Sequence, residues 1–340
     1  MPRGARRRAG RTAADVHLSR RGALTAVAVA ALQRLASPAA AQVYPAAGPI
    51  RVIVPFAAAG PVDILARIIV DALSKQLGQS VIVENRGGAG GNIAMGVAAR
   101  AKPDGYTLLL TSSVLVVNPL LYKTVPFDPA KDFVPISLLG TSPNLMVAQP
   151  EFANTMIEFI AKAKARPGQL NYSTPGIGTK GHFAVELLKL RAGIDVVHVP
   201  YASGGQVVQS LLTGTTQLGS TALPAGEPLV RAGTLAGLVV SGNARWPTLP
   251  AVPTMVELGY PDFVAEIFTA LFAPAGTPSD VVSLLTAEVA KLSKDPAVIE
   301  KAGRAGYEWI GAGPDAVQRK MAEEMAQSQE VLRFSGITAQ

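Results

Sequence analysis

Two turns in the sequence combine glycine and proline as a strand-to-helix joint requires. They are Pro55 to Asp63 and Ser173 to His182, and each leads into a helical pattern of apolar residues. The first backbone N–H groups of a helix have no partner inside the helix and carry a partial positive charge. Such helix starts bind anions without needing Lys or Arg. Both turns therefore predict an anion site made of backbone N–H groups.

Further polar residues follow other apolar runs. Thr111 to Ser113 and Asn118 place hydroxyls and an amide among Val and Leu, where polar groups need hydrogen-bond partners. The glycine-rich segment Asn85 to Asn92 is better explained as a tight turn than as a ligand loop, because no charged phosphate partner accompanies it. Asp63 has two interpretations: it caps the helix that begins there, or it contacts a ligand.

Gly176, Gly178 and Gly181 match the dinucleotide-binding spacing G-x-G-x-x-G. That fingerprint also requires an acidic residue at the end of the next strand, where it would hold the ribose. Asp195 instead precedes the apolar run Val196 to Val199 and lies at the opposite end. The loop is therefore interpreted as a helix start that faces an anion, and no cofactor is expected.

Candidate catalytic residues are scarce. After residue 41 the histidines are His182 and His198, and no hydrolase or zinc-protease motif surrounds them. His198 alternates with apolar neighbours and is interpreted as a core residue, whereas His182 either faces a pocket or caps its helix. The lack of cysteine excludes disulfides, thiolate catalysis and Cys-type zinc sites. The sequence therefore predicts a protein that is not an enzyme and holds no metal.

Residues 1–41 predict an export signal. They contain eight Arg and one Asp, then an apolar stretch, and end in Ala39-Ala40-Ala41, a small-residue cleavage site before Gln42. A membrane anchor is the weaker interpretation, because the apolar run is short and Gln33 and Arg34 interrupt it. Ser19-Arg20-Arg21 partly matches a twin-arginine signal, so the general secretory and twin-arginine routes both stay open. We expect a periplasmic protein.

Removal of the signal changes the electrostatic picture of the chain. The whole sequence has 31 basic and 24 acidic residues, and after the signal 23 of each remain. The basic character therefore belongs to the export signal, and the mature chain is neutral. This balance gives no support to binding of nucleic acid or of anionic membranes.

The turns must be positioned by alternating strands and helices. Helical spacing is clearest from Ile64 to Leu77, where the helix should stop at Gly78, and a capping box at Thr155 and Glu158 announces another helix. Short apolar runs predict strands at Arg51–Pro55, Ser80–Glu84, Tyr106–Leu110, Leu170–Ser173, Val196–Val199 and Leu235–Val240. Strict alternation predicts an α/β fold with parallel sheets and helices on both faces.

Several motifs together resemble one family, the Bug-type extracytoplasmic receptors, which are the substrate-binding components of tripartite tricarboxylate transporters. The motifs that carry the resemblance are Val54–Arg67, Val83–Asn92, Pro103–Leu108, Asn118–Tyr122, His198–Tyr201 and Leu271–Pro278. The resemblance covers the whole chain after the signal. It implies that the protein delivers a captured ligand to an integral-membrane permease.

The resemblance also implies a two-lobed periplasmic-binding-protein fold, type II-like, in which each lobe is a doubly wound sheet flanked by helices. We expect residues 42–140 and 271–340 to form lobe 1 and residues 141–270 to form lobe 2. The chain would cross between the lobes near 139–144 and 266–272. Hinge closure would then surround the ligand and exclude water.

Departures from the family pattern concern the ligand. Thr221 stands where members that bind amino acids carry Asp, and a hydroxyl cannot supply the charge that pairs with an ammonium. Ala59-Gly60 replaces a Gly-Gly pair, and Ala202 replaces a basic residue, so the pocket should be slightly more apolar. We therefore expect a small organic carboxylate without an amino group, with an aromatic or branched acid as plausible as citrate.

The candidate ligand-binding residues are Phe56, Ala58, Ala59, Gly60, Asp63, Ser112, Ser113, Thr174, Gly176, Gly178, Thr179, His182, Tyr201 and Thr221. A monomer is expected. Two alternatives stay open: an orphan binding protein that serves a sensor pathway, and a secreted hydrolase or lyase on the same fold. The enzyme would have only His182 and Asp63 as titratable candidates.

Overall fold

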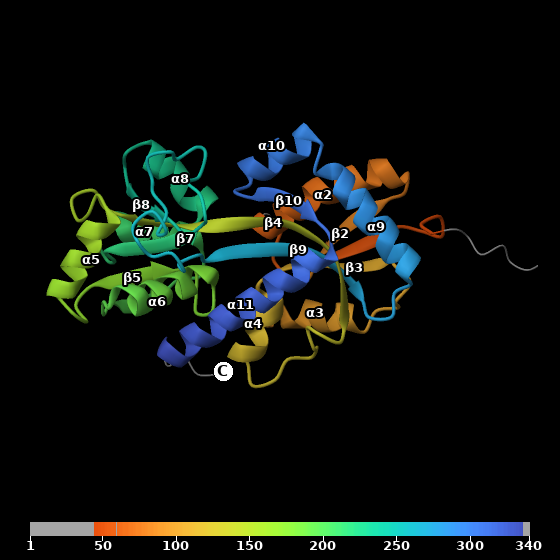
Figure 1. Ribbon diagram of the computed structural model, residues 1–340, viewed down its shortest axis with the longest axis horizontal. Coiled ribbons are helices and arrows are strands. Elements are labelled where there is room, and N and C mark those ends of the chain that lie inside the picture. Colours follow the sequence, from red (N-terminus) through yellow and green to blue (C-terminus); the bar gives the residue numbers. More distant parts are fainter. Residues whose placement is uncertain (1–43, 59, 336–340) are drawn as a thin grey trace, which may run out of the picture. The chain divides into compact units, whose positions relative to one another are not determined.

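The computed structural model describes residues 44–58 and 60–335 (Figure 1). The predicted export signal, residues 1–41, lies outside the described residues, and so does Ala59. In the described part no helix is both long enough and apolar enough to cross a membrane.

Strands and helices alternate along most of the described chain. The strands are β1 (Ile50–Val54), β2 (Val81–Asn85), β3 (Thr107–Ser112), β4 (Phe133–Ala148), β5 (Asn171–Thr174), β6 (Val197–Pro200), β7 (Leu218–Ala222), β8 (Ala236–Val240), β9 (Glu266–Pro274) and β10 (Glu308–Ala312). The helices are α2 (Pro61–Leu77), α3 (Asn92–Ala99), α4 (Val114–Leu121), α5 (Met156–Ala165), α6 (Lys180–Ala192), α7 (Gly204–Leu212), α8 (Leu223–Arg231), α9 (Ser279–Leu292), α10 (Pro296–Arg304) and α11 (Pro314–Ser335).

The ten strands form two sheets that share β4. The first sheet has the order β2-β1-β3-β9-β4, with β10 also paired to β4, and the second continues from β4 through β7 and β5 to β6, with β8 also on β4. Parallel pairs join β1 to β2 and β3, and β5 to β6 and β7. All pairs that involve β4 or β9 are antiparallel. The predicted α/β class is confirmed, but the sheets are mixed rather than purely parallel.

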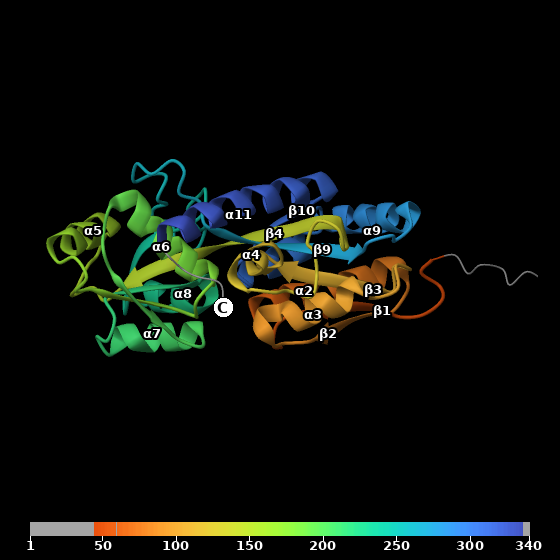
Figure 2. The ribbon, with the colours of Figure 1, turned by 90° about the horizontal axis from the view of Figure 1, so that it is seen from below.

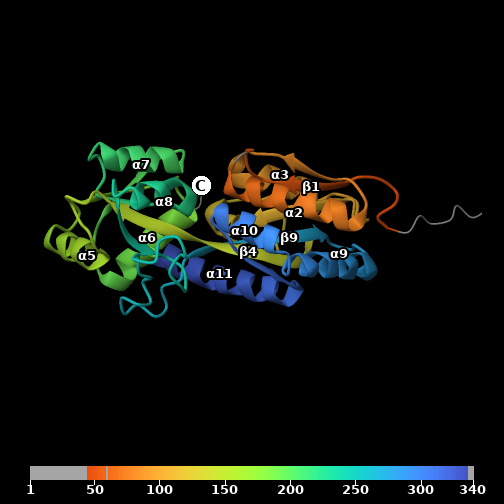
Figure 3. The ribbon, with the colours of Figure 1, turned by 90° about the horizontal axis from the view of Figure 1, so that it is seen from above.

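The two long strands β4 and β9 carry the chain between the sheets (Figures 2 and 3). From Phe133 to Pro143, β4 pairs with β9, and from Asn144 onward it pairs with β7 and β8. This change of partner falls inside one of the two predicted crossing segments. The exact lobe boundaries given above stay a prediction.

Each sheet is covered on both faces, because side chains alternate along a strand. In β1, Ile53 belongs to a core cluster that includes residues of α3, α4 and α11, whereas Val52 and Val54 belong to a cluster with residues of α2, α9 and α10. In the second sheet, Met146 belongs to the cluster that includes residues of α5 and α6, whereas Leu145 belongs to one with residues of α7 and α8. This is the doubly wound, two-lobed arrangement that the sequence predicts.

The helix ends follow the local signals in the sequence. Helix α2 begins with Pro61 after Gly60 and ends at Gly78, which has the left-handed φ of 59°. Helix α5 begins after Thr155, whose side chain accepts a hydrogen bond from the Glu158 N–H, as a capping box requires. The starts of α2, α4, α6, α7 and α8 lie beside one cavity.

Candidate functional site

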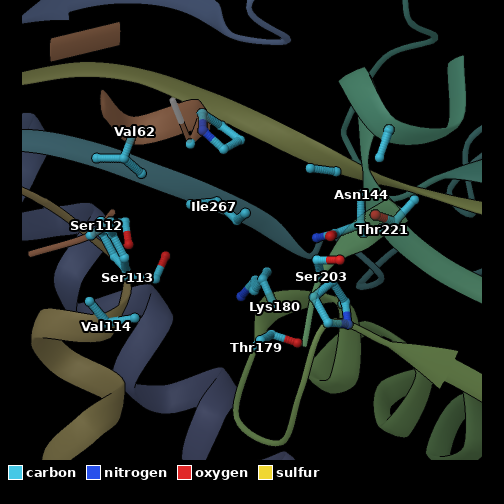
Figure 4. Close-up of a pocket in the computed structure, with 18 of the residues that line it drawn as sticks. Val62, Ser112, Ser113, Val114, Asn144, Thr179, Lys180, Ser203, Thr221 and Ile267 are labelled. Atoms are coloured by element: carbon cyan, nitrogen blue, oxygen red, sulfur yellow. The ribbon is translucent and has the colours of Figure 1, made fainter. Parts of the chain in front are cut away.

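A cavity of about 820 Å³ lies beyond the carboxyl ends of β1, β3 and β7, where ligands bind in folds of this class (Figure 4). It is lined by Phe56, Ala57, Ala58, Gly60, Pro61, Val62, Ile64, Ser112, Ser113, Val114, Val117, Asn144, Pro175, Gly178, Thr179, Lys180, Gly181, Phe183, Ala202, Ser203, Gly204, Gly205, Thr221, Ala222, Pro224, Ala225, Ile267, Tyr307 and Glu324. Both sheets contribute to this lining. The crossing strands add Asn144 from β4 and Ile267 from β9.

Five helices begin at this cavity. Helices α2 and α4 follow strands of the first sheet, and α6, α7 and α8 follow strands of the second. Figure 4 draws Ser112, Ser113 and Val114 on one side of the cavity and Thr179, Ser203 and Thr221 on the other. Each helix start adds a partial positive charge of about half a unit. The lining therefore favours an anion even before any side chain is considered.

Two caps on the second side satisfy only part of the N–H groups at these starts. The Thr179 hydroxyl accepts from the His182 N–H, and the Ser203 hydroxyl accepts from the Gln206 N–H. Both caps bond to the third residue of the helix. The N–H groups of the first two residues of α6 and α7 have no intrahelical partner, and these residues line the cavity.

Gly204 shows how closely the backbone of α7 approaches its neighbours. A Cβ at this position would come within 2.5 Å of Thr221 Oγ1 and 3.0 Å of the Ala225 side chain. Any residue larger than glycine would therefore push Thr221 or α8 away. Because of this close packing at Gly204, the backbone segments at Ser203, Thr221 and Ala225 lie close together and line the same part of the cavity.

Thr221 is a polar lining residue whose hydroxyl is buried. The residue is 1% exposed, and its Oγ1 has no hydrogen-bond partner among the described residues. A buried hydroxyl without a partner is costly. On the opposite side, Ser113 Oγ accepts from the Phe268 N–H at 3.2 Å. An acceptor group on a ligand would satisfy the Thr221 hydroxyl.

The structure brings together eight of the candidate residues named from the sequence. Phe56, Ala58, Gly60, Ser112, Ser113, Gly178, Thr179 and Thr221 line the cavity. Five others do not line it: Asp63, Thr174, Gly176, His182 and Tyr201. Ala59 lies outside the described residues. Two of the residues that do not line the cavity, Asp63 and His182, make hydrogen bonds that hold the lining turns in place.

Asp63 stabilises the first turn, Pro55 to Asp63, through hydrogen bonds. Its carboxylate accepts hydrogen bonds from Arg67 Nε at 2.9 Å and from Asn85 Nδ2 at 2.8 Å. Asn85 Nδ2 also donates to the Phe56 carbonyl at 3.1 Å. The cap residue of α2 is Gly60, so Asp63 lies in the first helical turn and not at the cap. Asp63 therefore ties α2, the end of β2 and the turn at Phe56 together.

His182 supports the second turn in a similar way. Its Nδ1 accepts a hydrogen bond from the Gly178 N–H at 3.2 Å, and its ring stacks on His198 with centroids 4.1 Å apart. Burial lowers the pKa of both imidazoles to about 4, so both are neutral at pH 7. Thr174 Oγ1 contacts His198 Nε2 at 2.7 Å and accepts from the Gly176 N–H. The neutral imidazole thus holds the Gly178 loop at the cavity.

Lys180 and Glu324 are lining residues that the sequence interpretation missed. Lys180 is the first residue of α6, and its Nζ lies 2.8 Å from both Glu324 carboxylate oxygens. Glu324 belongs to α11, which packs on β4, α4 and α6 (Figure 1). Lys180 stands inside the G-x-G-x-x-G match and could have been suspected, but no sequence signal links it to a residue 144 positions away.

Ionisable side chains are rare in this lining. Among the described lining residues they are Lys180, Glu324 and Tyr307, and burial raises the pKa of Tyr307 to about 12. The remaining wall is largely apolar, with Phe56, Val114 and Phe183 among its larger side chains. Residues 44–58 and 60–335 contain no cluster of three or more His, Asp or Glu side chains that could hold a metal ion. The chemistry of the site is therefore that of backbone amides, hydroxyls and apolar surface.

Comparison with known proteins agrees with this geometry. Residues 65–337 match the model of the tripartite tricarboxylate transporter family receptor. The chain is 37% identical to the protein BugT of Bordetella pertussis over 305 residues, which cover 89% of this chain and 93% of BugT.

Two solved structures of similar proteins contain carboxylates. The R. palustris protein Rpa4515 with adipate is 32% identical, with a TM-score of 0.77 over 87% of this chain and all of that one. MatC from Rhodopseudomonas palustris with bound malate is 29% identical, with a TM-score of 0.71 over 84% of this chain and 99% of that one. Sequence and structure together show that the chain belongs to the Bug-type receptors of the tripartite tricarboxylate transporter family, which are periplasmic solute-binding proteins.

Proposed function

We propose that this protein captures a small organic carboxylate in the cavity and delivers it to a membrane transporter. The observation that carries the proposal is the convergence of five helix starts on one largely apolar cavity. A carboxylate there would accept hydrogen bonds from backbone N–H groups and lie in the positive field of the helices. The apolar wall would contact its carbon skeleton.

The ligand should lack an amino group. An ammonium needs a carboxylate or several acceptors close by. Thr221 offers a hydroxyl, and both oxygens of Glu324, the carboxylate in the lining, already accept from Lys180. This arrangement supports the sequence-based expectation of a carboxylate without an amino group.

The size and polarity of the cavity indicate the ligand class more closely. Its volume of about 820 Å³ is larger than the smallest carboxylic acids would fill. Its wall includes Phe56, Val62, Val117 and Ile267. The relatives described above were solved with adipate and with malate. We therefore favour mono- and dicarboxylates with an apolar skeleton.

A binding role is favoured over catalysis. The titratable candidates for an enzyme, Asp63 and His182, lie outside the lining, and each holds a turn through hydrogen bonds. The proposal includes export to the periplasm through the signal at residues 1–41, a monomeric receptor and closure of the two lobes around the ligand. The family description, a receptor of the tripartite tricarboxylate transporter, supports delivery to a permease.

Thermal shift and isothermal titration with the chain from Gln42 onward test this proposal. Adipate, malate, citrate and benzoate are compared with the corresponding methyl esters and with glutamate. At a hundredfold excess over Kd, a bound acid should stabilise the protein by about 2.7 kcal/mol, and the esters should not. If no acid raised the melting temperature, or if glutamate bound as tightly as adipate, the proposed ligand class would be wrong.

A further inference from the structure

Lys180 and Glu324 form part of the wall between two cavities. Both residues line the main cavity, and both also line a second cavity of about 270 Å³. The second cavity lies against the start of β9 and the middle of α11, where Glu266 and Lys320 also line it. Figure 4 draws Lys180 beside Thr179, on the side of the main cavity formed by the second sheet. The ion pair is thus positioned to influence any anion bound there.

The lysine ammonium is fully occupied within the protein. It has three N–H donors, and three acceptors surround it: both oxygens of Glu324 at 2.8 Å and Gln327 Oε1 at 3.1 Å. Glu324 Oε1 also accepts from Ser328 Oγ at 3.2 Å. The side chains of Lys180 and Glu324 are 5% and 3% exposed. A ligand carboxylate near Thr179 therefore meets a cation whose charge is already balanced.

Stability alone does not explain why an ion pair stands at this place. Burying two charges costs desolvation free energy, and an apolar pair of similar volume often stabilises a protein equally well. An apolar pair and this ion pair both leave the wall without net charge. The ion pair differs because each charge comes from a separate helix, so a change of one partner leaves a net charge beside the anion site.

We propose that the Lys180–Glu324 pair determines which ligand charge the cavity accepts. This inference rests on the proposed function and refines its substrate class. With the lysine neutralised, ligand charge is balanced only by helix starts, whose partial charges suit one or two carboxylates. A third carboxylate would lie in an apolar wall without a counter-charge. The receptor therefore prefers mono- and dicarboxylates to tricarboxylates of equal size.

Three six-carbon acids test this rule, because they differ in charge but not in carbon number: hexanoate, adipate and tricarballylate. Isothermal titration gives the Kd of each for the wild-type chain and for Glu324→Gln, Lys180→Gln and the double variant. Glu324→Gln leaves a net positive charge in the wall and should raise the affinity for tricarballylate relative to hexanoate at least about tenfold. Lys180→Gln leaves a negative charge and should shift the ratio in the opposite direction.

The double variant restores neutrality and should return the ratio to within about threefold of the wild type. Lys320→Gln is the matched control, because Lys320 lines only the second cavity, and its ratio should change less than about twofold. Melting temperatures are recorded for every variant. If Glu324→Gln does not fold, Lys180→Gln still tests the rule through the opposite sign.

A uniform change in affinity for all three acids would overturn the rule, because it would mean that the pair only joins α6 to α11. An unchanged ratio in folded Glu324→Gln and Lys180→Gln would overturn it as well. These outcomes leave carboxylate binding by the wild type intact. If the wild-type chain bound neither these three acids nor malate, citrate or benzoate, the proposed function itself would fail, and the charge rule with it.

Discussion

The two sides of the cavity are built from helix starts of different kinds. On the side of the first sheet, α2 and α4 begin without a side-chain cap and present Phe56, Val62 and Val114. On the side of the second sheet, α6 and α7 begin with capping hydroxyls, and Thr221 and Lys180 stand beside them. We expect from this difference that hydroxyl contacts to a carboxylate come from the second side, and that the first side supplies more of the apolar wall around the carbon skeleton.

The support behind the second side depends on pH, and this gives the largest expected effect. The pKa of His182 is lowered from about 6.5 to about 4 by burial, so the unfolded chain takes up a proton at pH values where the folded protein does not. The contribution of His182 alone should be full above pH 6.5 and should fall by roughly 3 kcal/mol as the pH approaches 4. Urea unfolding between pH 7.5 and 4.5 measures this loss.

The groups around His182 affect its pKa and determine the control variant for that experiment. His198 stacks on it and has a similarly lowered pKa, Glu186 lies 4.0 Å from its Nε2, and Lys189 lowers its pKa. A His182→Gln/His198→Gln variant should lose much less stability over the same pH range. Equal losses in the wild type and in this variant would show that other groups cause the pH dependence.

Gly204→Ala should abolish much of the carboxylate affinity, because the added methyl collides with Thr221 Oγ1 on the second side. We expect Kd to rise about a hundredfold or more, since backbone donors displaced by about 1 Å lose their hydrogen bonds. Gly205→Ala is the matched variant, because the nearest atom to its new methyl is Ser203 Oγ at 3.9 Å. If both variants bound adipate equally well by titration, the second side would not be the carboxylate site.

Phe56→Ala tests whether the first side contacts the carbon skeleton of the ligand. Removal of the ring should weaken adipate binding about tenfold, because apolar area on the four-methylene skeleton is no longer covered. Malate, with a single methylene, should lose less than about threefold. Equal losses for the two acids in isothermal titration would mean that Phe56 acts on the carboxylate and not on the skeleton.

Thr221→Val should give the smallest effect. Valine keeps the shape of threonine but removes the hydroxyl that has no partner among the described residues. A lost neutral hydrogen bond to the ligand should raise Kd about fivefold, whereas the free protein should become no less stable. Unchanged affinity together with increased stability would indicate that the hydroxyl does not contact the ligand.

The sequence predicted most of the fold, and eight of the fourteen candidate residues named from it line the cavity. Proline and glycine at Gly60-Pro61 and around Gly178 located two helix starts, because such residues are needed wherever the chain turns sharply. The direction of side chains behind those turns could not be predicted. Asp63 and His182 stand in the correct turns, but they point away from the cavity and hold the backbone in place.

Non-local features escaped prediction for a different reason. The antiparallel placement of β9 depends on pairing with β3 and β4. The local sequence of these strands does not indicate which strand each one pairs with. The starts of α7 and α8 add lining through Gly204 and Pro224, which became apparent only when the second sheet was assembled. Likewise, Lys180 meets Glu324 because α11 returns across α6.

The chain enters the second sheet through β4 and leaves it through β9, and these strands are direct neighbours in antiparallel register, with Pro143 opposite Glu266. The entry and exit points of the intervening stretch therefore emerge side by side. Such a stretch can be exchanged between relatives as one cassette with two adjacent junctions. Chimaeras of this kind would transplant one half of the recognition surface and leave the other half native, which offers a direct route to receptors of altered selectivity.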